Sequence, residues 1–344
     1  MTTTVKPSDL LALLMLCIPA HEPVLITGKP GIGKTDIIAQ ACAAVGADLI
    51  VSHPVVNDPT DYKGLPYVVD GGATFMPFGE LKDLINATKL TVYFMDDLGQ
   101  ATPAVQAAAM QLILARRING HKVSDHVVFL AATNRRADRA GVTGILEPVK
   151  SRFASIVELD VDFADWRKWA LAHGIREEVI AYLSMKEEYL CDFKPTADLV
   201  NSPSPRTWSA VSRLLNLNLP SRLMIPAIEG AIGASVAGEF VSFLRIWQSL
   251  ISPSLILSAP DTAPLPTEPS ASYAVMTAIA KRVQTTSMGA FCRYNERMIA
   301  SGRGDMAAVS VKTALARTDA VALTNTPAYI KAAAGPIGQL LIGG

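Results

Sequence analysis

The sequence predicts an α/β protein with a parallel sheet in its first half, followed by an all-helical region. Up to about Asp160, short runs rich in β-branched residues alternate with helical stretches, which is the pattern of βαβ units. Beyond Asp160, apolar residues recur with the helical period. The 344 residues are 50% hydrophobic, which is enough to bury one or two sizeable cores. Intrinsic disorder is therefore excluded for most of the chain.

Five apolar runs in the first half are predicted to be strands, and three segments of the second half are predicted to be helices. The strands are expected at Val24 to Thr27, Leu49 to Ser52, Val92 to Asp96, Val127 to Ala132 and Ser155 to Leu159. The helices are expected at Phe163 to His173, Glu177 to Leu190 and Arg206 to Leu217.

Two further apolar stretches could be mistaken for a signal peptide or a membrane span. Leu10 to Ala20 is predicted to be a short packed helix, because a glycine-rich loop begins at Gly28, too close to a cleavage site. Met224 to Trp247 is long enough to span a bilayer, but three charged residues interrupt it, each costly in hydrocarbon. We expect it to be a buried helix of a soluble protein.

The second half changes character at a proline-rich segment. Ser252 to Ser270 carries five prolines, so we expect an extended connector rather than a regular helix. After it the chain is alanine-rich with helical spacing, and Gly335 to Gly344 is expected to be mobile. The predicted organisation is a core over residues 1–160, a helical lid over 161–251, and a connector with a helical extension over 252–344.

Charge and cysteine content limit the classes of function. The 31 basic residues balance 31 acidic ones, so no global charge favours nucleic acid or an anionic membrane. The four cysteines lie far apart, without metal-ligand spacing, which suits a reducing cytosol. The five histidines show no paired spacing for zinc, so a transition metal is not expected.

A phosphate-binding loop is the strongest motif in the chain. Residues 28–35 read Gly-Lys-Pro-Gly-Ile-Gly-Lys-Thr, which fits G-x-x-x-x-G-K-[ST] between a strand and a helix. Glycines let successive amides converge on phosphates, and the following helix adds its positive end. Lys34 should bridge the terminal phosphates and Thr35 should ligate magnesium. The candidate nucleotide-binding residues are Gly28, Pro30, Gly31, Ile32, Gly33, Lys34, Thr35 and Asp36.

Polar residues follow two other predicted strands, where strand ends would gather beside this loop. Asp96 is expected to hold magnesium, and Asp97 to polarise the attacking water. Asn134 could orient that water or sense the γ-phosphate. Taken alone, such residues also occur as turn formers and helix caps.

Basic residues cluster after Asn134, and spacing leaves three interpretations open. The cluster comprises Arg135, Arg136, Arg139, Lys150 and Arg152. It could be a solvated face, a nucleic-acid patch, or a source of charge for a neighbouring subunit's nucleotide.

Taken together in their order, these motifs resemble the AAA+ ATPases, a P-loop NTPase family, and within it the MoxR-like group that includes the CbbQ and NorQ type activators. The matching stretches are Gly28 to Thr35, Phe94 to Gln106, Ala131 to Arg135 and Ser151 to Phe153. In the helical part, Pro203 to Trp208 is similar to the family's sensor-2 motif.

The resemblance implies an ATP- and Mg²⁺-dependent ring, usually hexameric, with nucleotide between subunits. Arg152 would then reach the neighbour's γ-phosphate, a contact worth roughly a thousandfold in rate. Arg206 would contact the nucleotide of its own subunit. Independently, Ser204 can cap a helix with Pro205 at its first position, which places Arg206 in the first turn. Relatives of this kind often act with a partner protein that carries a von Willebrand factor A domain.

Two inserts are expected in the first half. An Asp70-Gly71 turn between apolar runs predicts a hairpin near residues 65–78. In MoxR-like proteins an insert here faces the ring pore or a partner, so Tyr67, Phe75 and Met76 are candidate contact residues, although an ordinary hairpin core would also explain them. A second short hairpin is expected over residues 117–127, around Asn119-Gly120.

Asp97 departs from the family, which most often has glutamate at this position. Its side chain is about 1.5 Å shorter, and a misplacement near 1 Å can cost on the order of a hundredfold in rate. Three functions follow as hypotheses: a ring ATPase that remodels or activates a partner protein, a nucleotide-gated binding switch with slow hydrolysis, and a DNA-handling protein such as a helicase loader. The last would bind DNA through Arg135, Arg136 and Arg139, with steep salt dependence.

Overall fold

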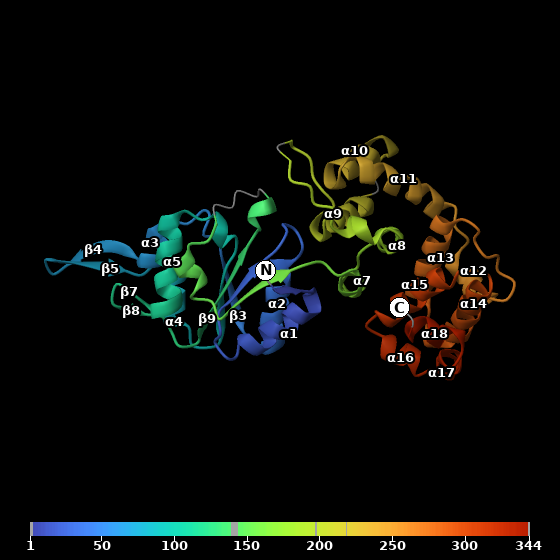
Figure 1. The fold of residues 1–344 in the computed structure, drawn as a ribbon, viewed down its shortest axis with the longest axis horizontal. Helices are drawn as coiled ribbons and strands as arrows, with labels where there is room; N and C mark the ends of the chain where they lie inside the picture. Colours follow the sequence, from blue (N-terminus) through green and yellow to red (C-terminus); the bar gives the residue numbers. More distant parts are fainter. Residues whose placement is uncertain (1–2, 139–143, 197, 218, 343–344) are drawn as a thin grey trace. The chain divides into compact units, whose positions relative to one another are not determined.

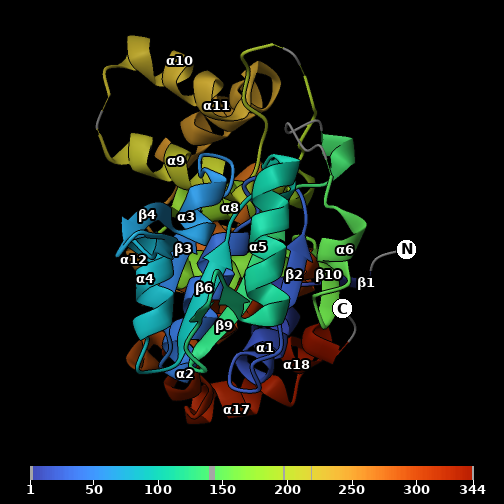
Figure 2. The same cartoon turned by 90° about the vertical axis from the view of Figure 1, so that its left-hand side faces the viewer.

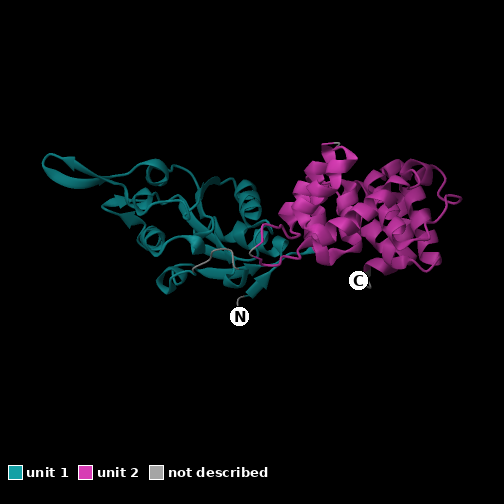
Figure 3. Ribbon diagram, turned by 90° about the horizontal axis from the view of Figure 1, so that it is seen from above, with its two compact units in different colours: residues 1–162 teal, residues 163–344 magenta. Residues whose placement is uncertain are grey.

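The computed structural model describes residues 3–138, 144–196, 198–217 and 219–342. The chain divides into two compact units, Met1–Asp162 and Phe163–Gly344, which Figure 3 shows in different colours. Throughout the described ranges, no helix combines the length and the apolar character needed to cross a membrane.

The first unit is built on a six-stranded parallel sheet in the order β1-β10-β2-β9-β6-β3. Its strands are β1 (Thr3–Val5), β2 (Val24–Thr27), β3 (Asp48–Ser52), β6 (Thr91–Met95), β9 (Val127–Thr133) and β10 (Ser155–Leu159). The five predicted strands are confirmed to within one residue at each end. The sequence did not reveal β1, because a three-residue edge strand has no apolar run of its own.

Helices cover both faces of this sheet, which explains why β6 and β9 are buried along their whole length. Side chains alternate between the faces. On one face, Tyr93 and Phe129 belong to a core shared with α4 (Gly79–Asn86) and α5 (Pro103–Ala115). Figure 1 shows α1 (Pro7–Cys17) and α2 (Lys34–Val45) on the opposite face, and Figure 2 views the sheet from the α4–α5 side.

Both predicted hairpins form, but the second spans residues 117–122 rather than 117–127. β4 (Leu65–Val69) pairs antiparallel with β5 (Gly72–Met76), and we call residues 65–76 the insert hairpin. Asp70 and Gly71 have φ of 50° and 77°, the pair of positive values that a tight type I′ turn requires. The second hairpin, residues 117–122, pairs β7 (Arg117–Ile118) with β8 (His121–Lys122). The short α3 (Pro59–Lys63) precedes the insert hairpin, and α6 (Glu147–Lys150) precedes β10.

Among its described residues, the second unit consists of helices joined by segments without regular structure. Those near its start are α7 (Phe163–Ala172), α8 (Glu177–Met185), α9 (Pro205–Asn216), α10 (Ser221–Ile232) and α11 (Ala234–Gln248). They are followed by α12 (Pro253–Ser258), α13 (Pro269–Arg282), α14 (Met288–Ala300), α15 (Gly304–Leu315), α16 (Ala320–Thr324), α17 (Pro327–Ala333) and α18 (Pro336–Ile342). Single 3-10 turns lie at Glu187–Leu190 and Thr285–Ser287 in this unit, and at Leu98–Gln100 and Arg136–Asp138 in the first unit.

The structure corrects three predictions for this unit. The single helix expected over Met224 to Trp247 is two helices, because Gly233 adopts φ 78° and ψ 153°, which no helix continues through. The expected connector contains α12, since Pro253 occupies a first helical position, where its missing N–H costs no hydrogen bond. The segment expected to be mobile carries α18, which starts at Pro336.

Candidate nucleotide-binding site

The loop between β2 and α2 has the curled backbone expected of a phosphate cradle. Gly31 and Gly33 have φ of 75° and 99°, conformations that side-chain-bearing residues rarely adopt. A Cβ at Gly28 would lie 2.7 Å from the Leu159 carbonyl oxygen, so only glycine fits against β10 there. Helix α2 begins directly after the loop, at Lys34, and no side chain caps its N-terminus at Gly33, as in anion-binding helix starts.

Lys34 reaches back across this loop and is only 7% exposed. Its Nζ donates to the carbonyl oxygens of Gly28, at 3.1 Å, and Lys29, at 3.0 Å. It also donates to Oδ1 of Asn134 at 2.8 Å. The ammonium therefore lies at the centre of the loop, where a bound phosphate would meet it.

Thr35 and Asp96 form a second contact beside the loop. The Thr35 hydroxyl donates to Oδ2 of Asp96 at 2.8 Å, and the Asp97 amide donates to Oδ1 of Asp96 at 3.1 Å. A hydroxyl and a carboxylate so placed are oxygen ligands of the kind Mg²⁺ prefers. Among the described residues, no group of three or more His, Cys, Asp or Glu side chains is placed to hold a metal ion by itself. These oxygens fit a magnesium ion that takes its remaining ligands from phosphate and water.

Asn134 connects Lys34 with Asp97. While its Oδ1 accepts from Lys34, its Nδ2 donates to Oδ1 of Asp97 at 3.0 Å. The sheet order explains this position: β9 lies between β2 and β6, so the residue after β9 falls between those that follow its two neighbours. Asp97 has φ 57°, a left-handed conformation that aspartate tolerates better than most residues.

Of the remaining predicted residues of this loop, Ile32 is buried against Gly28, and Pro30 is half-buried. Asp36 is exposed on α2 and accepts from Nε2 of Gln40 at 3.2 Å. Lys29 lies 4.0 Å from the carboxylate of Asp160, a contact that the sequence did not indicate.

The two arginines expected at the nucleotide occupy different units. Arg152, in the first unit, follows α6 and is half-buried, and its Nε is buried without a hydrogen-bond partner among the described residues. Arg206, in the second, lies in the first turn of α9. The predicted cap is confirmed, because the Ser204 hydroxyl accepts from the Thr207 amide at 3.2 Å.

The basic cluster after Asn134 is only partly available for a ligand. Arg135 donates to Asp138 through Nε and Nη2, at 3.0 and 2.7 Å, and to Glu158 through Nη1 at 3.1 Å. These two carboxylates raise the pKa of the Arg135 guanidinium. Lys150 pairs with Glu147 at 2.5 Å. Arg136 is exposed, and Arg139 lies outside the described residues.

Sequence reasoning assigned no role to Gln106, which the structure shows to be a buried junction. Its Nε2 donates to the carbonyl oxygens of Ala101 and Gly144, at 3.1 and 2.9 Å, and its Oε1 accepts from the Leu146 amide at 3.0 Å. A glutamine on the apolar face of a helix was the available signal, but the sequence does not show which loop it meets.

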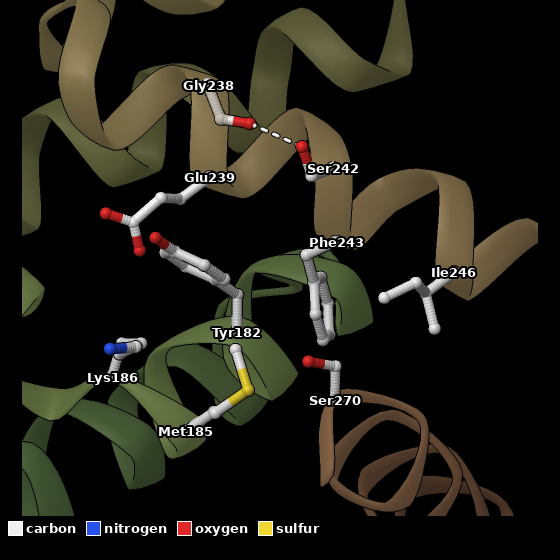
Figure 4. A pocket seen from close by; sticks show the side chains of 9 residues that line it. All are labelled: Tyr182, Met185, Lys186, Gly238, Glu239, Ser242, Phe243, Ile246 and Ser270. Carbon is white, nitrogen blue, oxygen red and sulfur yellow. Dashed lines mark hydrogen bonds between the residues drawn. The ribbon is translucent and has the colours of Figure 1, made fainter. Parts of the chain in front are cut away.

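A pocket of about 440 Å³ in the second unit has a different character. Tyr182 and Met185 of α8 face Phe243 and Ile246 of α11, with Glu239 at one side (Figure 4). Burial and the Glu239 carboxylate raise the pKa of Tyr182, so its hydroxyl is neutral. No glycine-rich cradle contributes to this lining, which makes the loop at Gly28 the better candidate for phosphate.

Comparison with known proteins agrees with this geometry. Residues 24–161 match the family described as ATPase family associated with various cellular activities (AAA). No curated protein matches the sequence.

Solved structures similar to this chain share little sequence with it. A point mutant of Thermotoga maritima RuvB is 17% identical, with 74% of this chain and 76% of that chain covered and a TM-score of 0.44. The T. maritima RuvB Holliday junction branch migration motor is 16% identical, with 74% of each chain covered and a TM-score of 0.39. NtrX from Brucella abortus in complex with ADP is 14% identical, covering 69% of this chain and 65% of that one, with a TM-score of 0.36. The parallel sheet and the loop at Gly28 lie within the segment, residues 24–161, that matches the AAA ATPase family domain, and this segment has the AAA+ P-loop NTPase fold.

Proposed function

We propose that this protein is a ring-forming, MoxR-like AAA+ ATPase that uses ATP hydrolysis to remodel or activate a partner protein. The observation that carries the proposal is the chain of hydrogen bonds from Lys34 through Asn134 to Asp97. It runs beside the contact between Thr35 and Asp96. A phosphate-binding lysine, a metal-binding pair and a carboxylate base thus share one edge of the sheet.

Each residue has a defined task in hydrolysis. The loop amides and Lys34 would hold the phosphates, and Thr35 and Asp96 would hold Mg²⁺, which would supply positive charge to offset that of the phosphates. Asp97 accepts a proton from the attacking water, and the Asn134 amide orients Asp97 and that water. Exchange of the Gly28 and Lys29 carbonyls for phosphate oxygens would turn Lys34 from the loop to the nucleotide.

A ring completes the site. The half-buried Arg152, whose Nε has no partner among the described residues, supplies its guanidinium to the γ-phosphate of the adjacent subunit, most simply in a hexamer. Arg206 contacts the nucleotide of its own subunit and couples it to a helical lid over residues 161–251. Residues 252–344 then form an extension of that lid.

The insert hairpin is the surface that we assign to the partner protein. All of its strand residues are exposed, including Tyr67 at 52%, Phe75 at 36% and Met76 at 51%. Exposed apolar side chains gathered on one projection are typical of an interaction site. The MoxR-like resemblance favours a partner with a von Willebrand factor A domain.

A nucleotide-gated switch is the second candidate, because Asp97 is one methylene shorter than glutamate and its carboxylate is held by Asn134. A DNA-handling role is disfavoured, since Arg135 is committed to Asp138 and Glu158. Its cation is therefore largely compensated within the protein and adds little to phosphate attraction.

Two measurements on the purified chain test the proposal: light scattering with and without ATP and Mg²⁺, and phosphate release beside nucleotide affinity. We expect nucleotide-dependent rings and turnover, both lost in Lys34→Ala, and turnover alone lost by a thousandfold or so in Arg152→Ala. Tight binding with negligible turnover, unchanged by Arg152→Ala, would establish the switch instead. A monomer under every condition would remove the role of Arg152.

A further inference from the structure

Gln106 lies on α5, is 1% exposed, and uses every polar atom of its amide. It donates to the Ala101 and Gly144 carbonyls and accepts from the Leu146 amide, all within 3.1 Å. The pattern requires a donor and an acceptor at the end of one side chain of this length. Neither glutamate nor an apolar side chain of the same size reproduces it.

The three partners belong to two segments that carry proposed catalytic residues. Ala101 closes the short turn that begins at Asp97, where the Gln100 amide donates to the Asp97 carbonyl and the Ala101 amide to the Leu98 carbonyl. Gly144 and Leu146 lie immediately before α6, the single helical turn that leads to Arg152. The buried amide of Gln106 thus joins two segments. One, residues 144–152, ends at Arg152, and we call it the Arg152 segment; the other, residues 97–101, begins at Asp97, and we call it the Asp97 segment.

The path from this junction to Arg152 is short and well packed. The Leu146 carbonyl accepts from the Val149 and Lys150 amides, and the Arg152 amide donates to the Val149 carbonyl at 3.1 Å. Val149 and Phe153, on either side of the arginine, are buried in the same core cluster as Val105 and Ala109 of α5. A shift of Leu146 would therefore move the backbone at Arg152 with it.

We propose that Gln106 is a positioning residue that sets where Arg152 is presented to the adjacent subunit, with its own subunit's Asp97 segment as the fixed reference. The inference rests on the proposed ring and names a residue that acts through Arg152 without touching nucleotide. Loss of the amide leaves two carbonyls and one amide unpaired in a buried place and lets the segment from residue 144 to Arg152 relax. Because a misplacement near 1 Å can cost about a hundredfold in rate, we expect turnover to fall by about ten- to a hundredfold.

Mixed rings locate the defect. Arg152→Ala subunits keep an intact nucleotide site but supply no arginine, whereas Asp97→Asn subunits supply the arginine and bind the nucleotide needed for ring assembly but lack the proposed base. Mixing the two should restore turnover at the shared sites. We expect Gln106→Met to lower this restored activity by about tenfold or more when it is added to the Asp97→Asn subunit, which supplies the arginine. Added to the Arg152→Ala subunit, it should change the activity by less than about twofold.

Gln111→Met, on the exposed side of α5, serves as the matched control and should have no effect in either subunit. Gln106→Glu, which keeps the size but cannot donate to the two carbonyls, should repeat the asymmetry. Melting temperature and nucleotide affinity of each variant show that it is folded. If Gln106→Met lowers the activity equally in either subunit, or in neither, the proposed role of Gln106 is wrong, although the nucleotide site is still formed by two subunits. If the mixed rings regain no activity when both subunits keep Gln106, the nucleotide site is not formed by two subunits, and the inference fails with it.

Discussion

Single side chains determine the geometry of the candidate nucleotide-binding site, and Asn134 is the clearest example. Its amide presents an acceptor to Lys34 and a donor to Asp97, so the two charges of opposite sign are joined through a neutral group. Lys34 is buried, and three hydrogen bonds from its ammonium offset the free-energy cost of removing this charge from water. The geometry of these three residues therefore depends on the orientation of one amide.

Replacing Asn134 tests this dependence. In Asn134→Ala, Lys34 loses one acceptor and the Asp97 carboxylate loses the Asn134 amide donor, so in the proposed reaction the carboxylate would no longer be oriented toward the attacking water. We expect kcat to fall by about ten- to a hundredfold while the Kd for nucleotide changes by less than about threefold. Phosphate release and fluorescent-nucleotide binding measure the two quantities. Asn86→Ala, an exposed asparagine on α4, is the control, and an equal loss in both variants would contradict the assignment.

Two glycines are predicted to respond in opposite ways to the same substitution. At Gly28, a Cβ would meet the Leu159 carbonyl oxygen at 2.7 Å and Ile32 Cδ1 at 2.8 Å, so Gly28→Ala should destabilise the first unit by roughly 1–3 kcal/mol. At Gly230, inside α10, a Cβ meets nothing within 4 Å, so Gly230→Ala should stabilise the second unit by roughly 0.5–1 kcal/mol. Urea unfolding curves of both variants give the signs, and a stabilised Gly28→Ala protein would refute the close approach of the loop to β10.

At the scale of elements, the order of the strands explains why the residues that follow β2, β6 and β9 lie together in the nucleotide-binding site. Contacts from the second hairpin hold the insert hairpin. Asn119 Nδ2 donates to the Lys63 carbonyl at 2.7 Å, and His121 Nε2 lies 2.8 Å from the Phe75 carbonyl oxygen. The second hairpin thus contacts the end of α3, just before the insert hairpin, and β5 within the insert hairpin. It is itself joined to the start of β9, because Arg116 Nη2 donates to the Val127 carbonyl at 2.9 Å. β9 ends one residue before Asn134, so this strand connects the second hairpin with the nucleotide-binding site.

Helices α2 and α14 each bury a thiol, which gives a prediction about reactivity and pH. Burial raises the pKa of Cys42 and of Cys292 to about 11, from 9.0. At pH 8 both should react with a thiol reagent far more slowly than the half-buried Cys17 and Cys191. Mass spectrometry after timed labelling identifies the order, with protein in guanidinium as the reference in which all four react alike.

The same two groups affect stability at high pH. Their folded-state pKa exceeds the unfolded value, so their contribution is fully present below about pH 9 and is lost as the pH rises toward about 11. Cys42→Ser and Cys292→Ser variants should each show a weaker loss of unfolding free energy over that range. A pH dependence unchanged in both variants would contradict burial of the thiols.

At the scale of the whole molecule, the chain has separate cores in its two units. The first is centred on the sheet and α5, and the second includes Met276, Phe291 and Val311 of α13, α14 and α15. Each unit therefore has the apolar interior needed for cooperative unfolding of its own.

Calorimetry should accordingly show two transitions. ATP with Mg²⁺ at a hundredfold excess over Kd should stabilise the unit of residues 1–162 by about 2.7 kcal/mol and raise its transition temperature. Lys34→Ala should abolish that shift without removing either transition. The nucleotide contact proposed for Arg206 should raise the second transition as well, and a second transition that does not shift would contradict that contact. A single transition would contradict independent cores.

The sequence was sufficient to predict the parallel sheet, the phosphate loop, both hairpins and the cap at Ser204, because each depends on residues close together in the chain. Strand periodicity, glycine at positive φ and a capping hydroxyl are local requirements, and they leave local patterns. The pairing of Asn134 with Lys34 and Asp97, the commitment of Arg135 to Glu158, and the junction at Gln106 required the tertiary structure. So did the break at Gly233 and the helix at Pro253, since a glycine or a proline permits a turn or a helix start and only packing selects between them. Contacts between distant residues depend on strand order and side-chain direction, which a single sequence does not specify.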